Sequence, residues 1–335
     1  PVGLFAVFEL GLLSLKCHLI DNLDKIGGQC AELYPEKPIY DIPARHSITG
    51  QELTDELMKQ AKPFDPTFHL NQQAEKIEKT ADGWKLTTSS NQIIQAKCIV
   101  IAAGAGSFVP RKPPIENIDQ YENKSVLYAI RNKSLLTDKK IIIAGGGDSA
   151  LDWTNDLAAT SEVTLIHRRK EFRAAPDSVA KMLELEKQGK IKFEIGQIHS
   201  LTDENGILSG VNIKNDSEIK LLKTDFLLPF FGLKMELGPV ANWGLNLYEN
   251  LIEVDTEKFE TSIPSIFAIG DINFYPGKLK LILSGFHEAA LMAQKCFNYC
   301  HPEKKNVFKY MNNCFFATKV SFMNEMYDIA NKCNV

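Results

Sequence analysis

The 335-residue sequence lacks a cysteine framework. Its seven cysteines are scattered, and no pair has the Cys-x-x-Cys spacing. A dithiol redox motif and a zinc site built on such pairs are therefore excluded. Cys296 and Cys300 stand one turn apart on an expected helix, where we interpret them as core or surface thiols. An odd, scattered count favours reduced thiols and a cytoplasmic location.

The sequence also lacks a large charge of either sign and a long apolar run. Its formal net charge is −4, so no global basic field is present to attract nucleic acid. The apolar segment up to Leu15 contains Glu9, has no basic residues before it and is too short to span a bilayer. We expect neither a nucleic acid nor a membrane as a partner.

The clearest positive feature is a glycine-rich segment in the middle of the chain. Ile141, Ile142 and Ile143 predict a buried strand, and no glycine or proline interrupts the helix expected from Asp148 onward. The residues between them form a tight turn with the Gly-x-Gly-x-x-Gly/Ala spacing that binds a dinucleotide pyrophosphate at a helix N-terminus. The residues of this site are Gly145, Gly146, Gly147, Asp148, Ser149 and Ala150.

The next strand, residues 163–166, is followed by basic residues. His167, Arg168 and Arg169 come directly after it, and Arg173 lies slightly further on. An enzyme specific for NAD has Asp or Glu at this position, whereas arginine accommodates the 2′-phosphate of NADP. The alternative is a solvated basic turn without a ligand. The position after the second strand of the unit favours NADP.

The beginning of the chain predicts a buried helix followed by a strand that ends at Asp21. If Gly3 is the last glycine of a second dinucleotide motif, Asp21 lies at the distance expected for a carboxylate that binds a ribose hydroxyl. The first strand and first two glycines of that motif would then precede residue 1. The alternative is that Asp21 is an ordinary acidic residue at the end of a strand.

A long loop rich in glycine, proline and tyrosine covers residues 26–43. Long ordered loops are often functional, and Tyr34 could lie flat on a planar cofactor. Alternatively, Tyr34 and Tyr40 pack the loop against the fold. A helix over residues 49–62 follows, with Thr49 and Glu52 in the positions of a capping box.

Two similar apolar segments flank the central region. Residues 99–104 and 266–270 both read as a buried strand ending in glycine. The predicted fold is α/β, with two Rossmann-like dinucleotide-binding domains, one for FAD and one for NADPH, the second inserted within the first. The expected segments are 1–114 and 239–310 for FAD, 115–238 for NADPH, and a tail over 311–335. Two nucleotide sites on one chain suggest hydride transfer to a flavin.

Several motifs together resemble those of the ferredoxin–NADP reductases of the thioredoxin-reductase-like type, in the pyridine nucleotide-disulfide oxidoreductase superfamily. These are Gly27-Gly28-Gln29, Leu33-Tyr34-Pro35-Glu36-Lys37, the segment Gly145 to Trp153, His167-Arg168-Arg169, and Gly270-Asp271 with Tyr275 to Ile282. The resemblance implies FAD, NADP(H), a homodimer, and ferredoxin or flavodoxin as partner. Thioredoxin reductase itself needs a Cys-x-x-Cys before the glycine turn, where this chain has residues 128–131 without cysteine.

The resemblance also assigns roles to individual residues. Tyr34 would stack on the flavin, with Tyr310 as a second aromatic; Asp21 would bind the FAD ribose and Asp271 the ribityl chain. The FAD residues implied are Gly3, Asp21, Gly28, Gln29, Tyr34, Ala74, Phe108, Gly270 and Asp271. No side chain would act as acid or base, because hydride transfer to FAD and the following single-electron steps depend on positioning.

Electrostatics adds two expectations. The start of the last helix, with Lys278 or Lys280, would favour an anionic reduced flavin. Lys62, Arg111 and Lys112 are candidates for docking an acidic ferredoxin.

The tail after residue 310 departs from the family, since Asn312 stands where Ser or Thr is expected. Two alternative functions therefore stay open: an NADPH-dependent flavoprotein reductase of another acceptor, and a truncated, non-catalytic NADP-binding remnant.

Overall fold

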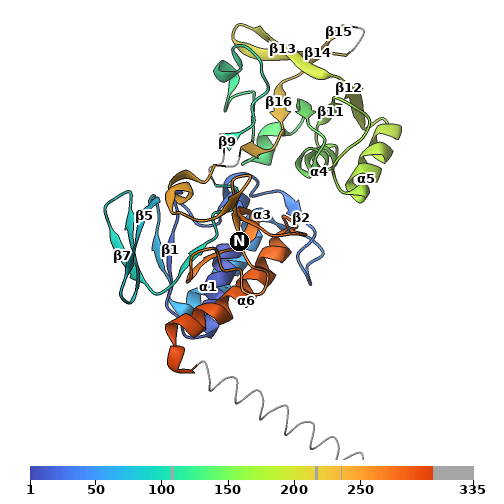
Figure 1. Cartoon of the computed structure of the whole chain (residues 1–335). Helices are drawn as coiled ribbons and strands as arrows, with labels where there is room; N and C mark the ends of the chain where they lie inside the picture. Colours follow the sequence, from blue (N-terminus) through green and yellow to red (C-terminus); the bar gives the residue numbers. More distant parts are fainter. Residues whose placement is uncertain (107–108, 216–217, 235, 305–335) are drawn as a thin grey trace, which may run out of the picture. The chain divides into compact units, whose positions relative to one another are not determined.

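The computed structural model describes residues 1–106, 109–215, 218–234 and 236–304. The chain divides into two compact units (Figure 1). The first unit comprises Pro1, Asp21–Gln60 and Ala103–Ala241; the second comprises Val2–Ile20, Ala61–Ala102 and Asn242–Val335. Among the described residues, no helix combines the length and the apolar character that crossing a membrane requires.

A four-stranded parallel sheet forms the centre of the first unit. Its strands, in spatial order, are β12 (Ile191–Ile195), β11 (Glu162–His167), β10 (Lys140–Ala144) and β16 (Phe226–Pro229). β10 is rich in isoleucine, which suits a strand buried on both faces. Its register places Ile142 opposite Thr164 on one side and Leu227 on the other.

Alternate residues of β10 belong to two separate cores. Ile141 and Ile143 pack with the core that contains residues of α4 (Asp148–Leu157) and α5 (Pro176–Lys187). Ile142 packs in the other core, which includes residues of the antiparallel sheet β13 (Gln197–Glu204), β14 (Ile207–Lys214) and β15 (Ile219–Lys223). The sheet is thus covered on both faces, as the apolar run predicted.

The remaining elements of the first unit are short, apart from one helix. They are α2 (Gln29–Glu32), β2 (Pro38–Ile39), β3 (Ile48–Thr49), β9 (Val109–Pro110), η2 (Ile118–Tyr121), η3 (Lys133–Leu136) and β17 (Leu233–Lys234). The helix α3 (Gly50–Ala61) begins at the predicted capping box: the amide of Glu52 donates to Thr49 Oγ1 over 3.2 Å, and the amide of Thr49 donates to Glu52 Oε2 over 2.9 Å. The capping box is therefore confirmed.

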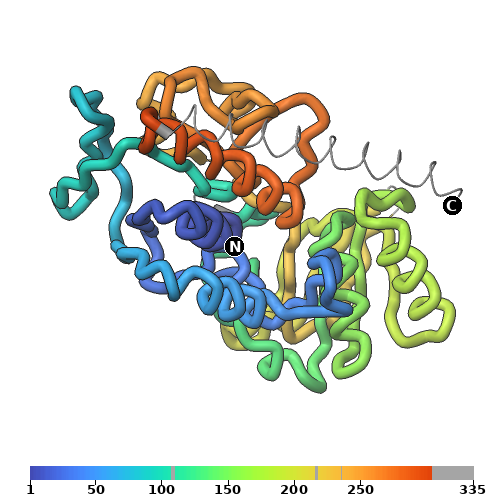
Figure 2. The backbone as a smooth tube through the Cα atoms, turned by 90° about the horizontal axis from the view of Figure 1, so that it is seen from below, coloured from blue at the N-terminus to red at the C-terminus, as the bar shows by residue number. Residues whose placement is uncertain are grey.

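In the described part of the second unit, the α-helices α1 and α6, whose coils are visible in Figure 2, accompany several small sheets. α1 (Val2–Leu12) packs along α6 (Ile282–Cys300), with Ala6 and Leu10 in the same core as Met292. Parallel pairs join β1 (His18–Ile20) to β4 (Thr67–His69) and β8 (Ile99–Ile101) to β20 (Ile266–Ala268). The others are η1 (Lys62–Phe64), β5 (Ala74–Thr80), β6 (Gly83–Thr88), β7 (Ile93–Ala96), β18 (Leu247–Tyr248), β19 (Leu251–Glu253), η5 (Gly270–Ile272), β21 (Asn273–Phe274) and η6 (Pro302–Lys304); η4 (Gly238–Asn242) spans the boundary between the units.

The two similar sequence segments are neighbours in the structure, since Ile99 pairs with Ile266 and Ile101 with Ala268. The predicted helix and strand at the beginning of the chain are observed as α1 and β1. The compact first unit groups Asp21–Gln60 with Ala103–Ala241. The division of the chain at residues 114 and 238 stays a prediction.

Candidate nucleotide-binding site

The turn between β10 and α4 is closely packed at its first glycine. Gly145 has φ +155°, and a Cβ atom there would lie 2.6 Å from the carbonyl oxygen of Phe230 and 3.0 Å from Cβ of Ala150. Its amide donates to the carbonyl of Ile166 over 3.0 Å. Only glycine fits this position, because any side chain would collide with backbone that belongs to a neighbouring strand end.

The third glycine of the turn faces open space. Gly147 is the N-cap residue of α4, and a Cβ atom there would have nothing within 4 Å. Because glycine has no side chain to cap the helix, the first amides of α4 remain available to an anion. The turn thus combines a tight bend with an accessible helix N-terminus, which is the geometry that binds a pyrophosphate.

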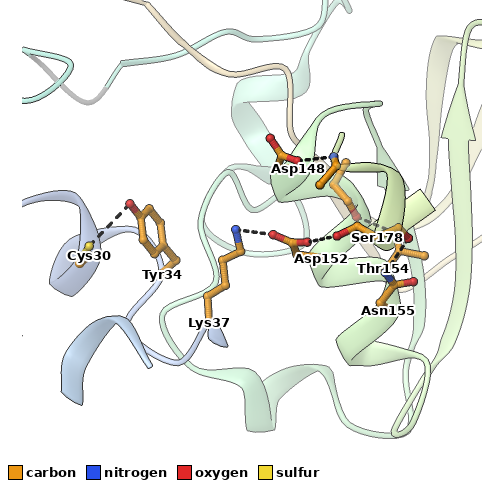
Figure 3. A network of polar contacts seen from close by, with 10 residues as sticks. Cys30, Tyr34, Lys37, Asp148, Asp152, Thr154, Asn155 and Ser178 are labelled. Carbon is orange, nitrogen blue, oxygen red and sulfur yellow. Dashed lines mark hydrogen bonds and ion pairs between the residues drawn. The ribbon is translucent and has the colours of Figure 1, made fainter. Parts of the chain in front are cut away.

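The arginine-containing segment is attached to this turn by two hydrogen bonds. The amide of Arg173 donates to the carbonyl of Gly146 over 2.7 Å. The amide of Ala175 donates to Asp148 Oδ1 over 2.8 Å (Figure 3). The side chains of Arg168, Arg169 and Arg173 are exposed. The structure therefore brings the predicted 2′-phosphate residues next to the glycine turn, and Asp148 helps to hold them there.

The ring of His167 packs against Gly146 of the turn. A Cβ atom on Gly146 would lie 2.3 Å from its ring, and the ring stacks on Phe172 with a centroid distance of 5.2 Å. Burial is the main cause that lowers the pKa of His167, with a smaller contribution from the neighbouring arginines. The lowered pKa favours the neutral imidazole, so the arginines rather than His167 provide the positive charge for a ligand phosphate.

The loop that contains Tyr34 is joined to α4 by an ion pair. Lys37 Nζ lies 2.8 Å from Asp152 Oδ2, and both side chains are mostly buried, with exposures of 16% and 18% (Figure 3). Asp152 also accepts a hydrogen bond from Ser178 Oγ over 3.0 Å. The two most specific sequence motifs, which contain Tyr34 and Asp152 respectively, are therefore in contact through their charged residues.

Tyr34 itself is half-buried and packs against the core of the first unit. Its hydroxyl lies 3.7 Å from Sγ of Cys30, and Lys37 Nζ lies 5.7 Å from its ring centroid. These contacts are compatible with either interpretation, so the stacking of Tyr34 on the flavin stays a prediction. Tyr40, in contrast, is 60% exposed, and Lys181 Nζ lies 5.8 Å from its ring centroid.

Three further FAD residues implied by the resemblance lie in the first unit. Gln29 lies beside the turn at Gly104, where an added Cβ would approach its Nε2 to 3.0 Å. Gly28 has φ +57° and precedes α2. Asp21 accepts a hydrogen bond from the amide of Leu23 over 3.0 Å, and burial raises its pKa although this bond lowers it. Both interpretations of Asp21 stay open.

The second unit contains four of the implied FAD residues. Gly270 has φ +77°, and its added Cβ would contact the side chain of Val2 at 3.5 Å, so the turn lies beside the start of α1 and the neighbouring Gly3. Asp271 follows it and is half-buried. Burial is the largest cause that raises its pKa, whereas Lys278 and Lys280 lower it. Ala74 begins β5 and is half-buried.

Lys278 is buried in an ion pair, and the expectation that Lys278 or Lys280 favours the anionic reduced flavin stays a prediction. Its ammonium forms an ion pair with Glu288, and the exposures of the two side chains are 4% and 0%. The positive charge is thus neutralised inside the unit, which sequence reasoning missed because Glu288 appears there as an ordinary helical residue. Lys280 is exposed, and α6 begins at Ile282. Phe108 and Tyr310 lie outside the described residues.

Comparison with known proteins agrees with this architecture. A family model described as "Pyridine nucleotide-disulphide oxidoreductase" matches residues 31–270. The crystal structure of thioredoxin reductase from T. acidophilum superposes with a TM-score of 0.77 at 21% identity, covering 89% of this chain and 94% of that one. Fold and site therefore define a dinucleotide-binding oxidoreductase of the pyridine nucleotide-disulphide class, and the predicted α/β fold class is confirmed.

Curated relatives narrow this class. A protein named ferredoxin–NADP reductase from Parvibaculum lavamentivorans is 60% identical over 313 residues, which cover 92% of this chain and 91% of the relative. One from Bradyrhizobium sp. with the same name is 58% identical over 313 residues, covering 92% of each. The chain belongs to the ferredoxin–NADP reductase family, and the resemblance seen in its motifs is confirmed.

Replacing Gly147 tests the open end of the turn. The Cβ of Gly147→Ala contacts nothing in the protein, so we expect an unchanged unfolding midpoint in urea. The same methyl group would occupy the approach path of a pyrophosphate, so the dissociation constant for NADPH should increase about tenfold or more. Isothermal titration measures this value. Equal NADPH affinity in Gly147→Ala and the parent protein would place the dinucleotide elsewhere.

Replacing Asp271 separates stability from binding. Its pKa is higher in the folded protein than in the unfolded chain, so ionisation of Asp271 lowers the free energy of unfolding. This loss is absent at a pH below the pKa in the unfolded chain and is complete once the pH has risen through the pKa in the folded protein. The side chain of Asp271→Asn does not ionise. Without flavin, the variant should therefore have a higher free energy of unfolding than the parent at pH 7, and the difference should disappear at acidic pH. Urea unfolding between pH 3 and 8, about the range in which a carboxyl titrates, measures it.

The same variant should bind FAD about tenfold or more weakly if Asp271 holds a ligand hydroxyl. A variant that gains no stability at pH 7 contradicts the electrostatic account. A variant that keeps full FAD affinity contradicts the binding role.

Proposed function

We propose that the protein transfers electrons between NADPH and ferredoxin with FAD as its cofactor. The observation that carries the proposal is the glycine turn at Gly145 and Gly147, to which the arginine segment is hydrogen-bonded through Arg173 and Ala175. This arrangement fits a dinucleotide with a 2′-phosphate. The relatives named ferredoxin–NADP reductase support the choice of acceptor.

The residues present also fit a flavin dinucleotide. Gly270, with its positive φ, and the half-buried carboxyl of Asp271 offer a close backbone approach and an acceptor for ligand hydroxyls. Gln29, which the resemblance also implies, belongs to the first unit, where it lies beside the Gly104 turn. When bound, FAD accepts a hydride from NADPH and releases electrons singly to an iron–sulfur partner.

This chain's own residues orient the nucleotides. The amides at the start of α4 bind the pyrophosphate, and the guanidinium groups of Arg168, Arg169 and Arg173 bind the 2′-phosphate. Tyr34 would stack on the flavin, and Tyr310 would be a second aromatic residue beside it. No side chain acts as acid or base, because the protein contributes to hydride transfer by positioning the two nucleotides.

Partners beyond the nucleotides complete the proposal. Ferredoxin or flavodoxin approaches the flavin edge, and the protein forms a homodimer. Among the docking candidates, Lys112 is paired with Asp119 at 2.8 Å and Glu122 at 2.7 Å, so its charge is already balanced. Lys62 and Arg111 are exposed and are the better candidates. A cytoplasmic location agrees with the five cysteines of the described residues, none of which forms a disulfide there.

The test is NADPH-driven reduction of cytochrome c on FAD-reconstituted protein, with and without ferredoxin. Activity that depends on ferredoxin and prefers NADPH over NADH supports the proposal. Equal rates without ferredoxin favour the reductase of another acceptor. A colourless protein that binds NADPH without turnover favours the non-catalytic remnant.

Coenzyme preference tests the arginines. Arg168→Ala should raise KM for NADPH by about one to two orders of magnitude, which corresponds to the loss of one hydrogen bond to a charged group. KM for NADH should be unchanged, because NADH has no 2′-phosphate. Lys190→Ala removes an exposed cation elsewhere in the same unit and serves as the control. A loss of affinity for both coenzymes in Arg168→Ala, or an equal loss in Lys190→Ala, would contradict 2′-phosphate recognition.

A further inference from the structure

Glu288 is a fully buried carboxylate in α6 that no step of the proposed reaction uses. It accepts hydrogen bonds from the Gly270 turn and from three residues that follow it. Oε2 accepts from the amide of Gly270 over 2.6 Å and from Asn273 Nδ2 over 2.9 Å. Oε1 accepts from the hydroxyl of Tyr275 over 3.0 Å and from the ammonium of Lys278. All five residues belong to the second unit.

A contribution to stability does not by itself explain the burial of Glu288 and Lys278. Removing a carboxylate and an ammonium from water costs several kcal/mol for each ion, and a buried pair often gives no net stabilisation relative to apolar residues of similar size. Lys278 and Glu288 are 4% and 0% exposed, so both bear this cost in full. A buried pair of this kind is expected where the orientation of neighbouring groups matters.

The groups that Glu288 orients are those implied in FAD binding. Its bond to the amide of Gly270 fixes a turn with φ +77°, and Asp271 is the next residue along the chain. Asn273 connects the same carboxylate to the carbonyl of Ala268 over 2.9 Å, at the end of β20. The carboxylate therefore ties the end of a strand, the turn and the following segment to one helix.

We propose that Glu288 is a positioning residue for FAD, which holds the Gly270–Asp271 turn in its binding conformation and holds the ammonium of Lys278 inside the unit. This inference rests on the proposed function, since it requires that FAD binds at this turn. Glu288 does not touch the cofactor. It acts through the backbone of Gly270 and through Lys278, which it keeps buried.

The test compares variants of Glu288 with a matched carboxylate in the same unit. Glu288→Gln has one acceptor oxygen, so it cannot hold both the Gly270 amide and the Lys278 ammonium. Glu260→Gln is the control: Glu260 also accepts from a backbone amide, that of Ser265 over 2.8 Å, and from a hydroxyl, that of Tyr299 over 2.5 Å. Lys278→Met tests the other half of the pair.

FAD dissociation constants are measured by flavin fluorescence at a temperature below all unfolding midpoints, together with those midpoints for the flavin-free proteins. We expect Glu288→Gln to bind FAD about tenfold or more weakly, the loss of a hydrogen bond to a charged group, and Glu260→Gln to bind like the parent even if it unfolds earlier. Lys278→Met should retain most FAD affinity, because Glu288 still holds Gly270.

If the parent protein binds FAD, either of two results would overturn the inference about Glu288. One is an unchanged FAD dissociation constant in Glu288→Gln. The other is an equal weakening in Glu288→Gln and Glu260→Gln, which would show a general effect of stability. A parent protein that binds no FAD would instead overturn the proposed function, so the two failures are distinguishable.

Discussion

The close contact between the backbone of Gly145 and the carbonyl of Phe230, at the ends of the adjacent strands β10 and β16, sets the course of the chain into α4. A methyl group at residue 145 would lie 2.6 Å from that oxygen, so the bend exists only with glycine. The bend directs the uncapped N-terminus of α4 outward and leaves Gly147 accessible. The arginine segment depends on the same bend, because it is hydrogen-bonded to Gly146 and Asp148.

Charged residues play two different roles in this chain. The exposed arginines after β11 are available to a ligand phosphate, where a cation in water costs little. The pairs Lys37–Asp152 and Lys278–Glu288 are largely buried and bind protein groups instead. Their net contribution to stability is small, since desolvation offsets attraction, and their effect is to orient the Tyr34 loop and the Gly270 turn.

Much of the local structure was predictable from short sequence patterns. The capping box at Thr49 and the buried strand at residues 141–143 appear as expected, because each depends on a few consecutive residues. The partner of Lys278 was not predictable in this way. The expectation that Lys278 or Lys280 favours the anionic reduced flavin stays a prediction, but the sequence did not show that α6 supplies a carboxylate that pairs with Lys278 and buries it. The packing of His167 under Gly146 was missed for the same reason.

The sequence by itself determined the glycine spacing from Gly145 to Ala150, the arginines that follow the next strand, and the motifs that identify the family. These features are local: backbone conformation and charge at a strand end are encoded by a few consecutive residues. Only the tertiary structure decided which charges face solvent and which are neutralised, as for Lys37, Lys112 and Lys278. That outcome depends on side chains brought by other elements, because the cost of a charge is set by its burial and its partner rather than by its neighbours in sequence.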